Sequence, residues 1–292
     1  MMQTTLQNPQ RSIGAILIDA EMLSLEEAER ILKLQKEENL RFGDAAIRLG
    51  LLTDEDIRFA LSHQFSYTYL PLAGGRPVSE EVVAAYQPFS HLVEQLRSIR
   101  SQLLLRWFDR EAEQTTLALV GAARGEGRSY LAANLAVLFS QLGERTLLVD
   151  ADLRMPRQHE LFKLDNKRGL SSLLAGRGDE DAIVPIKAFS SLDVLPSGPV
   201  PPNPLELLNR PQFQQFLTEA GKRYEVVLID TTAMSQGADA AMVATHAGAV
   251  LAVGRNNVTR VSAFGEMVKS LNRNGVAVIG SVFNDPPLVK VA

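Results

Sequence analysis

Three short stretches contain residue types that could bind phosphate and a divalent cation. The first, VGAARGEGRSYLAANLA at 120–136, is a glycine-containing turn between an apolar segment and a helix-forming one. Glycines let backbone N–H groups converge on an anion, and the first turn of a helix adds positive potential. Gly127, Arg128 and Ser129 end a run with Walker A spacing, in which alanine replaces the first glycine and arginine the lysine. This turn predicts phosphate binding.

The other two stretches supply carboxylates. In LLVDADLRMPR, Asp150 and Asp152 follow an apolar run, and in YEVVLIDTTA, Asp230 follows a second apolar run. Two neighbouring carboxylates repel each other unless a cation lies between them, and Mg²⁺ prefers oxygen ligands. Each stretch alone has an ordinary explanation as well. The first could be only a tight turn, the second a solvated turn and the third an ordinary acid at the end of a strand. The three in order predict a nucleotide-binding fold.

The segments after Thr115 indicate how these motifs are positioned. Apolar runs that read as strands alternate with helical stretches, and several runs are continuous, as expected where both faces of a sheet are covered. The expected strands are 117–120, 146–150, 193–196, 226–230, 250–253 and 277–283. We predict an α/β fold, a doubly wound, mostly parallel sheet of the P-loop type. Ligands of such sheets bind at the carboxyl ends of the strands, where the three motifs lie.

The first 64 residues contain an internal repeat. Segment 13–35 aligns with segment 42–64, and each copy has an apolar segment, a cap and an amphipathic helix. Caps are expected at Ser24 and Thr53, where a hydroxyl can accept from the third residue's N–H while the acid there reaches back. The repeat predicts a small helical interaction domain whose two copies bury their apolar faces on each other.

Composition and the glycine and proline residues suggest the domain organisation. We expect a helical repeat domain at 1–70, a linker rich in glycine and proline at 71–90, and the α/β domain at 91–292.

The net charge of −4 gives no general attraction to nucleic acid or anionic membrane. The absence of cysteine excludes disulfides and thiolate chemistry. Without a visible secretion signal or spanning segment, we expect a cytoplasmic protein that reaches the inner face of the cell membrane only through a partner.

Longer matches give the α/β domain a family resemblance. Asp150-x-Asp152-x-Arg154 has the form of a Walker A′ motif. With GEGRS and VVLIDTT, it makes the chain resemble the bacterial tyrosine kinases of polysaccharide export, relatives of the MinD and ParA ATPases. PPNPLELL at 201–208 and GSVFNDP at 280–286 are also similar, and the fused repeat points to EpsG-like proteins. The resemblance implies an ATP- and Mg²⁺-dependent tyrosine kinase that controls exopolysaccharide chain length or export with a separate membrane copolymerase.

The same resemblance implies roles for individual residues. Nucleotide contacts would come from Gly125, Glu126, Gly127, Arg128, Ser129, Tyr130 and Asn284, the last near the adenine. Metal contacts would come from Ser129, Asp152 and Asp230, and catalysis from Asp150, Asp152 and Arg128. Asp150 would accept or steer the proton of an incoming tyrosine hydroxyl. Glu94, Arg97 and Arg100 resemble a ring-assembly motif and imply a homo-oligomer, although a solvated helix side gives the same spacing.

Two departures from the family pattern bear on activity. Arginine is broad and planar where lysine is a compact point charge, so Arg128 should preserve binding and reduce turnover. The sequence closes NDPPLVKVA, without the tyrosine-rich tail that such kinases phosphorylate; Tyr67 and Tyr69 are candidate acceptors or packing aromatics. These departures favour an alternative, a nucleotide-binding regulatory switch with little kinase activity. A ParA/MinD-like ATPase is a second alternative, but Ala123 stands where the signature lysine of ParA-like proteins is expected.

The N-terminal repeat resembles the MshEN domain found at the start of type II secretion ATPases, some of which bind cyclic-di-GMP. By this resemblance a cyclic-di-GMP site would include Gly14, Gln35, Arg41, Gly43, Gly50 and Gln64. The first copy departs from the pattern, with Ser12 in place of arginine and Glu21 in place of glycine. Because Glu21 adds negative charge where a phosphate would lie, a docking role without a ligand is the alternative.

Overall fold

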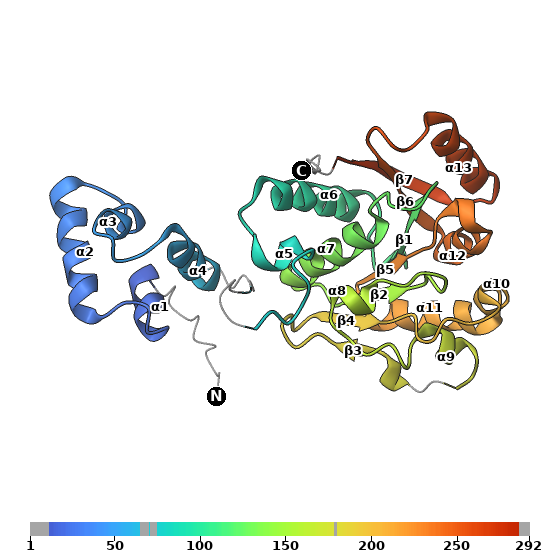
Figure 1. The fold of residues 1–292 in the computed structure, drawn as a ribbon, viewed down its shortest axis with the longest axis horizontal. Helices are drawn as coiled ribbons and strands as arrows, with labels where there is room; N and C mark the ends of the chain where they lie inside the picture. The colour runs from blue at the N-terminus through green and yellow to red at the C-terminus, as the bar shows by residue number, and fades with distance from the viewer. Residues whose placement is uncertain (1–11, 65–69, 71–74, 178–179, 286–292) are drawn as a thin grey trace, which may run out of the picture. The chain divides into compact units, whose positions relative to one another are not determined.

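The computed structural model describes residues 12–64, 70, 75–177 and 180–285, and the chain divides into two compact units, Met1–Ala73 and Gly74–Ala292 (Figure 1). Within the described residues of the first unit lie α1 (Ile13–Asp19), α2 (Leu25–Glu38), α3 (Phe42–Arg48) and α4 (Asp54–Gln64). The apolar segment that opens each repeat is therefore a short helix.

The first unit preserves the repeat in three dimensions. Its core holds the matching pairs Ile16 and Ala45, Leu17 and Ala46, Leu23 and Leu52, and Ile31 and Ala60. Both expected caps form. The Ser24 hydroxyl accepts from Glu27 N–H at 3.2 Å while Ser24 N–H donates to the Glu27 carboxylate at 2.9 Å, and Thr53 and Asp56 form the same reciprocal pair. Each cap satisfies backbone N–H groups that a helix start would leave unpaired.

A seven-stranded sheet organises the second unit and confirms the predicted fold. Its order is β3-β4-β2-β5-β1-β6-β7, and every pair is parallel except β3 with β4. The strands are β1 (Thr116–Gly121), β2 (Thr146–Asp150), β3 (Val184–Pro185), β4 (Leu192–Leu195), β5 (Val226–Asp230), β6 (Ala249–Arg255) and β7 (Ala277–Asn284). Only β3 was not expected, because two residues ending in proline carry no alternating pattern.

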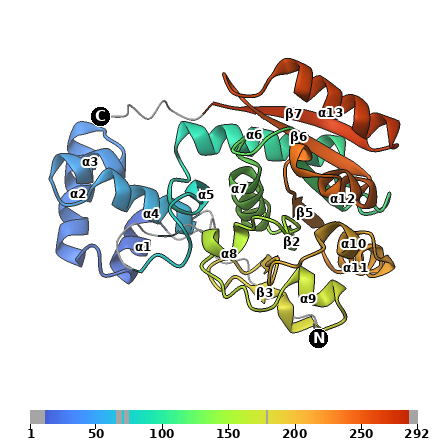
Figure 2. The same ribbon diagram turned by 45° about the vertical axis from the view of Figure 1, so that its right-hand side comes forward.

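Helices cover both faces of this sheet (Figures 1 and 2). The apolar helix α7 (Arg128–Gln141) packs on β1, β2 and β5, with α5 (Val83–Tyr86), α6 (His91–Arg106) and α8 (Gln158–Leu161) packed against it. The other helices of the unit are α9 (Leu170–Leu174), α10 (Pro204–Leu208), α11 (Pro211–Arg223), α12 (Asp239–Ala247) and α13 (Val261–Arg273). Of these, α11, α12 and α13 contact the sheet on the face opposite α7. Residues 131–140 of α7 are all buried, as a helix between a sheet and other helices must be.

The segment expected as a linker, 71–90, packs as part of the second unit from Gly75 onward. Val78, Val82 and Tyr86 are buried. The side-chain amide of Asn134 in α7 accepts from Ala84 N–H at 2.9 Å and donates to Glu81 O at 3.0 Å. The correction has a physical reason: apolar residues between the prolines have a core to enter, which glycine and proline content alone does not reveal.

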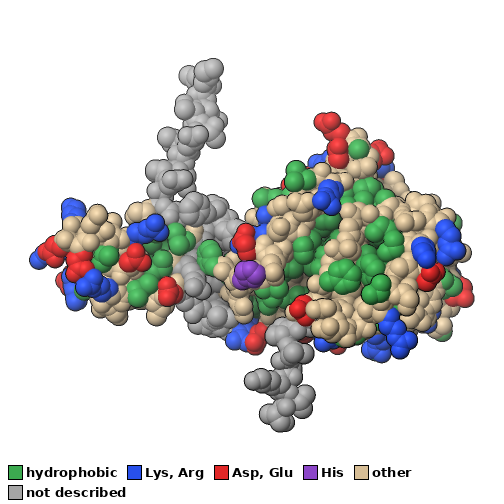
Figure 3. Space-filling view, turned by 90° about the horizontal axis from the view of Figure 1, so that it is seen from above, with side chains coloured by type: hydrophobic (Ala, Val, Ile, Leu, Met, Phe, Trp, Pro, Cys, Tyr) green, Lys and Arg blue, Asp and Glu red, His purple; other side chains and the backbone are tan. Residues whose placement is uncertain are grey.

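The edge strand β7 and α6 border an apolar groove. Its lining includes Leu92, Leu96, Ile99, Val282 and Phe283, and Figure 3 shows hydrophobic side chains gathered on this face of the unit. No described helix is long and apolar enough to cross a membrane.

Candidate functional site

The three sequence motifs meet at the carboxyl ends of the central strands. In the sheet register, Asp150 at the end of β2 lies beside Asp230 at the end of β5, and β5 also pairs with β1. The glycine turn follows β1 directly and leads into α7. Strands distant in sequence therefore bring the phosphate-binding turn and both acids to one edge of the sheet, where doubly wound folds bind ligands.

The turn has the backbone that phosphate binding requires. Gly125 and Gly127 have φ values of 76° and 93°, in the left-handed region that favours glycine. A Cβ at Gly127 would also meet the side-chain nitrogen of Asn284, which would have to shift. Asn284 in turn donates to Glu126 O at 3.3 Å. Asn284 thus lies against the turn, at the end of β7.

Arg128 points into the protein and binds the turn to itself. Its Nε donates to Thr231 O at 3.0 Å, and its Nη1 donates to Ala123 O at 2.7 Å. The same Nη1 lies 3.5 Å from the carboxylate of Glu126, which is fully buried. Glu126 also accepts from Ala123 N–H and from the Thr259 hydroxyl. The arginine that we predicted to contact phosphate has its guanidinium largely engaged by backbone and a carboxylate.

Asp150 lies below the cleft and organises the chain after β2. It is fully buried and accepts from the N–H groups of Asp152, Arg157 and Gln158 at 3.2, 3.1 and 2.9 Å. Burial, together with the Asp230 carboxylate, raises the pKa of Asp150 well above its usual value. Both of its oxygens are thus used to shape the turn that carries Asp152.

Asp230 has one oxygen satisfied and one left without a partner. Gln158 Nε2 donates to Asp230 Oδ2 at 2.8 Å, whereas Oδ1 is buried without a partner among the described residues. Burial raises the pKa of Asp230 to about 6, while the nearby Ser129 hydroxyl and the Gln158 amide act in the opposite direction. An unsatisfied buried carboxylate oxygen beside a serine hydroxyl fits Mg²⁺, which binds one or two carboxylates together with substrate phosphates.

Asp152 is the carboxylate that reaches the cleft. Its Oδ1 accepts from Arg154 N–H at 3.2 Å and Met155 N–H at 2.9 Å, while the Arg154 side chain pairs with buried Asp239 at 2.7 Å. Among the described residues no group of three or more acidic, histidine or cysteine side chains forms a complete metal site. A cation at Asp230 and Asp152 would therefore depend on Ser129, water and the ligand for its remaining oxygens.

A cleft of about 430 Å³ opens over these groups. The predicted site residues that line it are Gly125, Gly127, Arg128, Ser129, Tyr130, Asp152 and Asn284. Glu126, Asp150 and Asp230 are fully buried and do not line it. Glu81, Arg124, Met155, Arg157 and Arg255 complete the lining. Seven of the ten residues expected at this site therefore line the cleft, and the other three are buried without lining it.

Several contributors had no recognisable signal in the sequence. Gln158 links Asp230 to Ser129 O, at 2.8 and 3.1 Å, and Thr259 links Glu126 to the backbone of Arg255. Gln158 is the first residue of α8, six residues beyond Asp152, and Thr259 follows β6, so neither belongs to the three motifs. The only signal was their position after strands, which many unrelated polar residues share.

The residues expected to assemble a ring form contacts within the unit. Arg97 pairs with Glu94 along α6 at 2.9 Å, and Arg100 Nη1 donates to Leu138 O of α7 at 2.9 Å. The Arg100 contact helps to attach α6 to α7. Their role in assembly stays a prediction.

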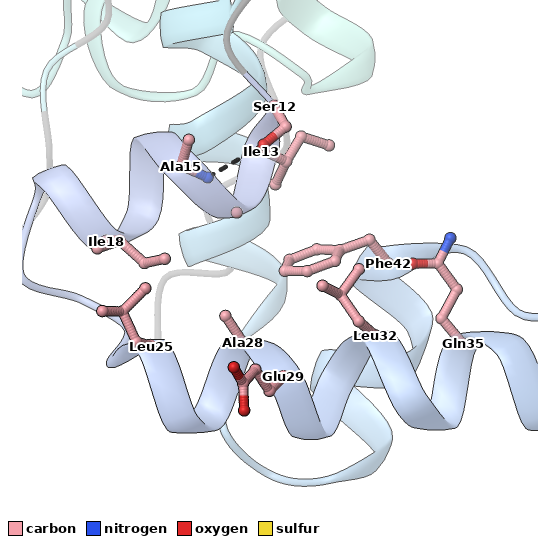
Figure 4. A pocket seen from close by; sticks show the side chains of 11 residues that line it. Ser12, Ile13, Ala15, Ile18, Leu25, Ala28, Glu29, Leu32, Gln35 and Phe42 are labelled. Atoms are coloured by element: carbon pink, nitrogen blue, oxygen red, sulfur yellow. Dashed lines mark hydrogen bonds between the residues drawn. The ribbon is translucent and has the colours of Figure 1, made fainter.

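The first unit has a pocket of about 500 Å³ between α1 and α2 (Figure 4). Gly14 and Gln35 of the predicted cyclic-di-GMP set line it, whereas Arg41, Gly43 and Gly50 do not, and the side chain of Gln64 lies outside the described part of the chain. Its described walls are mainly apolar, from Ile13, Ile18, Leu25, Ala28, Leu32 and Phe42, and the one charged residue among them is Glu29. The described lining therefore offers no cation to a dinucleotide phosphate.

The chain is similar to tyrosine-protein kinases of bacteria. It is 35% identical over 217 residues to tyrosine-protein kinase YwqD of Bacillus subtilis, covering 74% of this chain and 90% of that one. It is 35% identical over 204 residues to tyrosine-protein kinase wzc of Salmonella typhimurium, covering 70% of this chain. The chain spans only 28% of the length of wzc.

A solved structure shares the fold. The kinase domain of Escherichia coli tyrosine kinase ETK superposes with a TM-score of 0.68 and 30% identity, over 76% of this chain and 88% of that one. No protein-family model matches the chain.

Proposed function

The chain belongs to the bacterial tyrosine-protein kinases, and on this premise we propose that it is an ATP- and Mg²⁺-dependent protein tyrosine kinase. One observation carries the proposal. A glycine turn at a helix N-terminus meets two strand-end carboxylates, Asp150 and Asp230, beside a cleft of about 430 Å³. Phosphoryl transfer depends mainly on positioning and on neutralising charge, and this arrangement supports both.

The residues would divide the work as follows. Backbone N–H groups of the turn at 125–129 bind the phosphates at the positive end of α7. Ser129 and Asp230 would hold Mg²⁺ directly and Asp152 through water, and the bound ion would neutralise charge on the phosphate oxygens. Asp152, which lines the cleft, receives the proton of the incoming tyrosine hydroxyl. Asp150, whose oxygens accept three backbone N–H groups, positions the turn that carries Asp152.

We further propose that the kinase controls exopolysaccharide chain length or export. The support is the resemblance of its motifs to the kinases of polysaccharide export. In this role it would act as a homo-oligomer in the cytoplasm, at the inner face of the membrane through a separate membrane copolymerase.

Phosphotyrosine formation tests the proposed activity. Purified chain is incubated with ATP·Mg²⁺, alone and with the cytosolic segment of a copolymerase, and products are mapped by mass spectrometry. We expect Mg²⁺-dependent phosphotyrosine that is lost in Asp152→Asn and kept in the matched control Asp165→Asn, a largely exposed acid. ATP binding without any phosphotyrosine would reject the kinase.

That negative result would favour a nucleotide-binding regulatory switch. The observation behind this second candidate is the engaged guanidinium of Arg128, since a turn without a mobile cation could hold nucleotide and turn it over slowly. ATP-dependent binding to DNA, measured with the same preparation, would instead indicate a ParA/MinD-like ATPase.

We infer that the first unit is an interaction module, with cyclic-di-GMP as its candidate ligand. The internal repeat supports a module of this kind, whereas the apolar pocket at Ala28 favours docking without a nucleotide. Titration of the full chain with cyclic-di-GMP in a calorimeter, with Arg41→Ala as the variant, tests the ligand. Absence of heat and of a thermal shift would leave only docking.

A further inference from the structure

The charge around the phosphate cleft is distributed unusually, and this inference rests on the proposed nucleotide binding. A P-loop ordinarily presents a lysine to the phosphates. Here Arg128 has its Nε and Nη1 engaged by Thr231 O and Ala123 O, and it lies beside the buried carboxylate of Glu126. Because Glu126 carries the opposite charge at 3.5 Å, the pair adds little net charge to the cleft.

Three other arginines line the cleft, and their surroundings differ. Arg157 is paired with Glu81 at 2.8 Å and lies 3.7 Å from Glu160, so its charge is already balanced. The side chain of Arg124 is exposed on the turn. Arg255 is partly buried, and its Nη1 donates to Gly125 O at 3.3 Å. The guanidinium of Arg255 therefore lies over the phosphate-binding backbone and contacts no carboxylate in the described part of the chain.

The backbone of Arg255 is fixed by the same acid that holds Arg128. Arg255 N–H donates to the Thr259 hydroxyl at 2.8 Å, and that hydroxyl donates to Glu126 at 2.6 Å. Glu126 thus connects the inward arginine to the end of β6, the strand that pairs with β1. A cation fixed in this way is preorganised for an anion bound at the turn.

We propose that Arg255 supplies the positive charge to the phosphate chain that a P-loop lysine ordinarily supplies, and that Arg128 is a positioning residue that holds the shape of the turn. Arginine can donate to two phosphate oxygens at once. Arg255 reaches them from β6 and leaves the inward arginine in place. Nucleotide affinity should then depend on Arg255, and the stability of the empty turn on Arg128.

Affinity and stability measured on the same variants test this division. Full-length Arg255→Ala, Arg255→Lys, Arg128→Ala and Arg128→Lys are compared with wild type and with Arg260→Ala, a matched control for an exposed arginine five residues beyond Arg255. Binding of ATP·Mg²⁺ and ADP·Mg²⁺ is measured by calorimetry at two salt concentrations. Thermal unfolding is followed without nucleotide.

We expect Arg255→Ala to weaken ATP binding roughly 10- to 100-fold, the effect of one charge-assisted contact. ADP binding should weaken by no more than ATP binding, the salt dependence of affinity should decrease, and the melting temperature of the empty protein should not change. Arg255→Lys should recover part of the affinity. Arg128→Ala or, if that variant does not fold, Arg128→Lys should lower the melting temperature of the empty protein.

Two outcomes overturn the proposal. In the first, wild type binds ATP and Arg255→Ala binds it equally well. In the second, an Arg128 variant keeps the wild-type melting temperature and loses nucleotide affinity. A wild-type protein that binds no ATP would refute the proposed function and this inference together. That result is distinguishable from the two outcomes above, because in each of them wild type binds nucleotide.

Discussion

At the scale of single residues, Asp230 combines burial with an unsatisfied oxygen. Its pKa of about 6 lies above the usual 3.8, so the empty folded protein binds a proton there more tightly than the unfolded chain does. The stabilisation from that proton is complete below pH 3.8 and is lost as the pH rises through 6. Mg²⁺ requires the ionised carboxylate, so metal binding and protonation compete.

We therefore predict opposite effects of Asp230→Asn on stability and binding. Without nucleotide, the variant should melt at a higher temperature than wild type at pH 7.5, and the difference should shrink at pH 5. With ADP·Mg²⁺, wild type should gain more thermal stability at pH 7.5 than at pH 5, and the variant should gain little at either. Calorimetric melting curves at both pH values give the measurement. Equal stabilisation of the variant by ADP·Mg²⁺ would contradict a metal role.

Residue types in the motifs were predictable, but side-chain direction was not. Asp150, Asp152 and Asp230 were placed at strand ends because an apolar run followed by an acid has few other readings in an α/β protein. Arg128 was expected to face the phosphate because it occupies the position at which a Walker A turn carries its lysine. Its direction depends on Glu126 and on Thr231 O, a backbone atom 103 residues away, and such partners cannot be read from spacing.

At the scale of elements, α7 connects the cleft to the segment before α6. The Asn134 side chain satisfies Ala84 N–H and Glu81 O, and Glu81 pairs with Arg157 at the cleft. Asn134→Ala would leave the buried Ala84 N–H without its partner and remove the donor to Glu81 O, at a cost of about 1–3 kcal/mol. We predict that the variant loses unfolding free energy by that amount. Relative to wild type, its hydrogen exchange should increase more at 78–86 than in β1.

Chemical denaturation and hydrogen exchange on the same variant measure both effects. Gln215→Ala on α11, an exposed amide, is the matched control and should change neither. If exchange in β1 increased as much as at 78–86, the loss would be global and the segment would not be attached through Asn134.

Elements with strong patterns were predictable, and short ones were not. Continuous apolar runs located six strands to within about two residues of their observed ends, because buried parallel strands leave little choice of residue type. The two-residue β3 and the four-residue α5 have no period to detect. They form because β4 and α7 offer them partners, which is information from the tertiary structure.

At the scale of the whole molecule, the two units have separate cores. The larger cluster contains residues from 118 onward, and the smaller contains residues between 16 and 60. The described residues that line the phosphate cleft all belong to the second unit. Nucleotide binding should therefore reside in residues 74–292, and a chain with two cores need not unfold in one step.

We predict that a fragment of residues 74–292 binds ATP·Mg²⁺ with an affinity within about twofold of the full chain, a difference below 0.5 kcal/mol. Its thermal transition should match one of two transitions in the full chain, and the second should be absent. Calorimetric scans and titrations of the two proteins at equal concentration provide the comparison, with Arg255→Ala in both backgrounds as the control for the cleft. If the fragment bound nucleotide much more weakly while Arg255→Ala weakened both proteins equally, the first unit would contribute to the affinity, because the cleft itself would be intact.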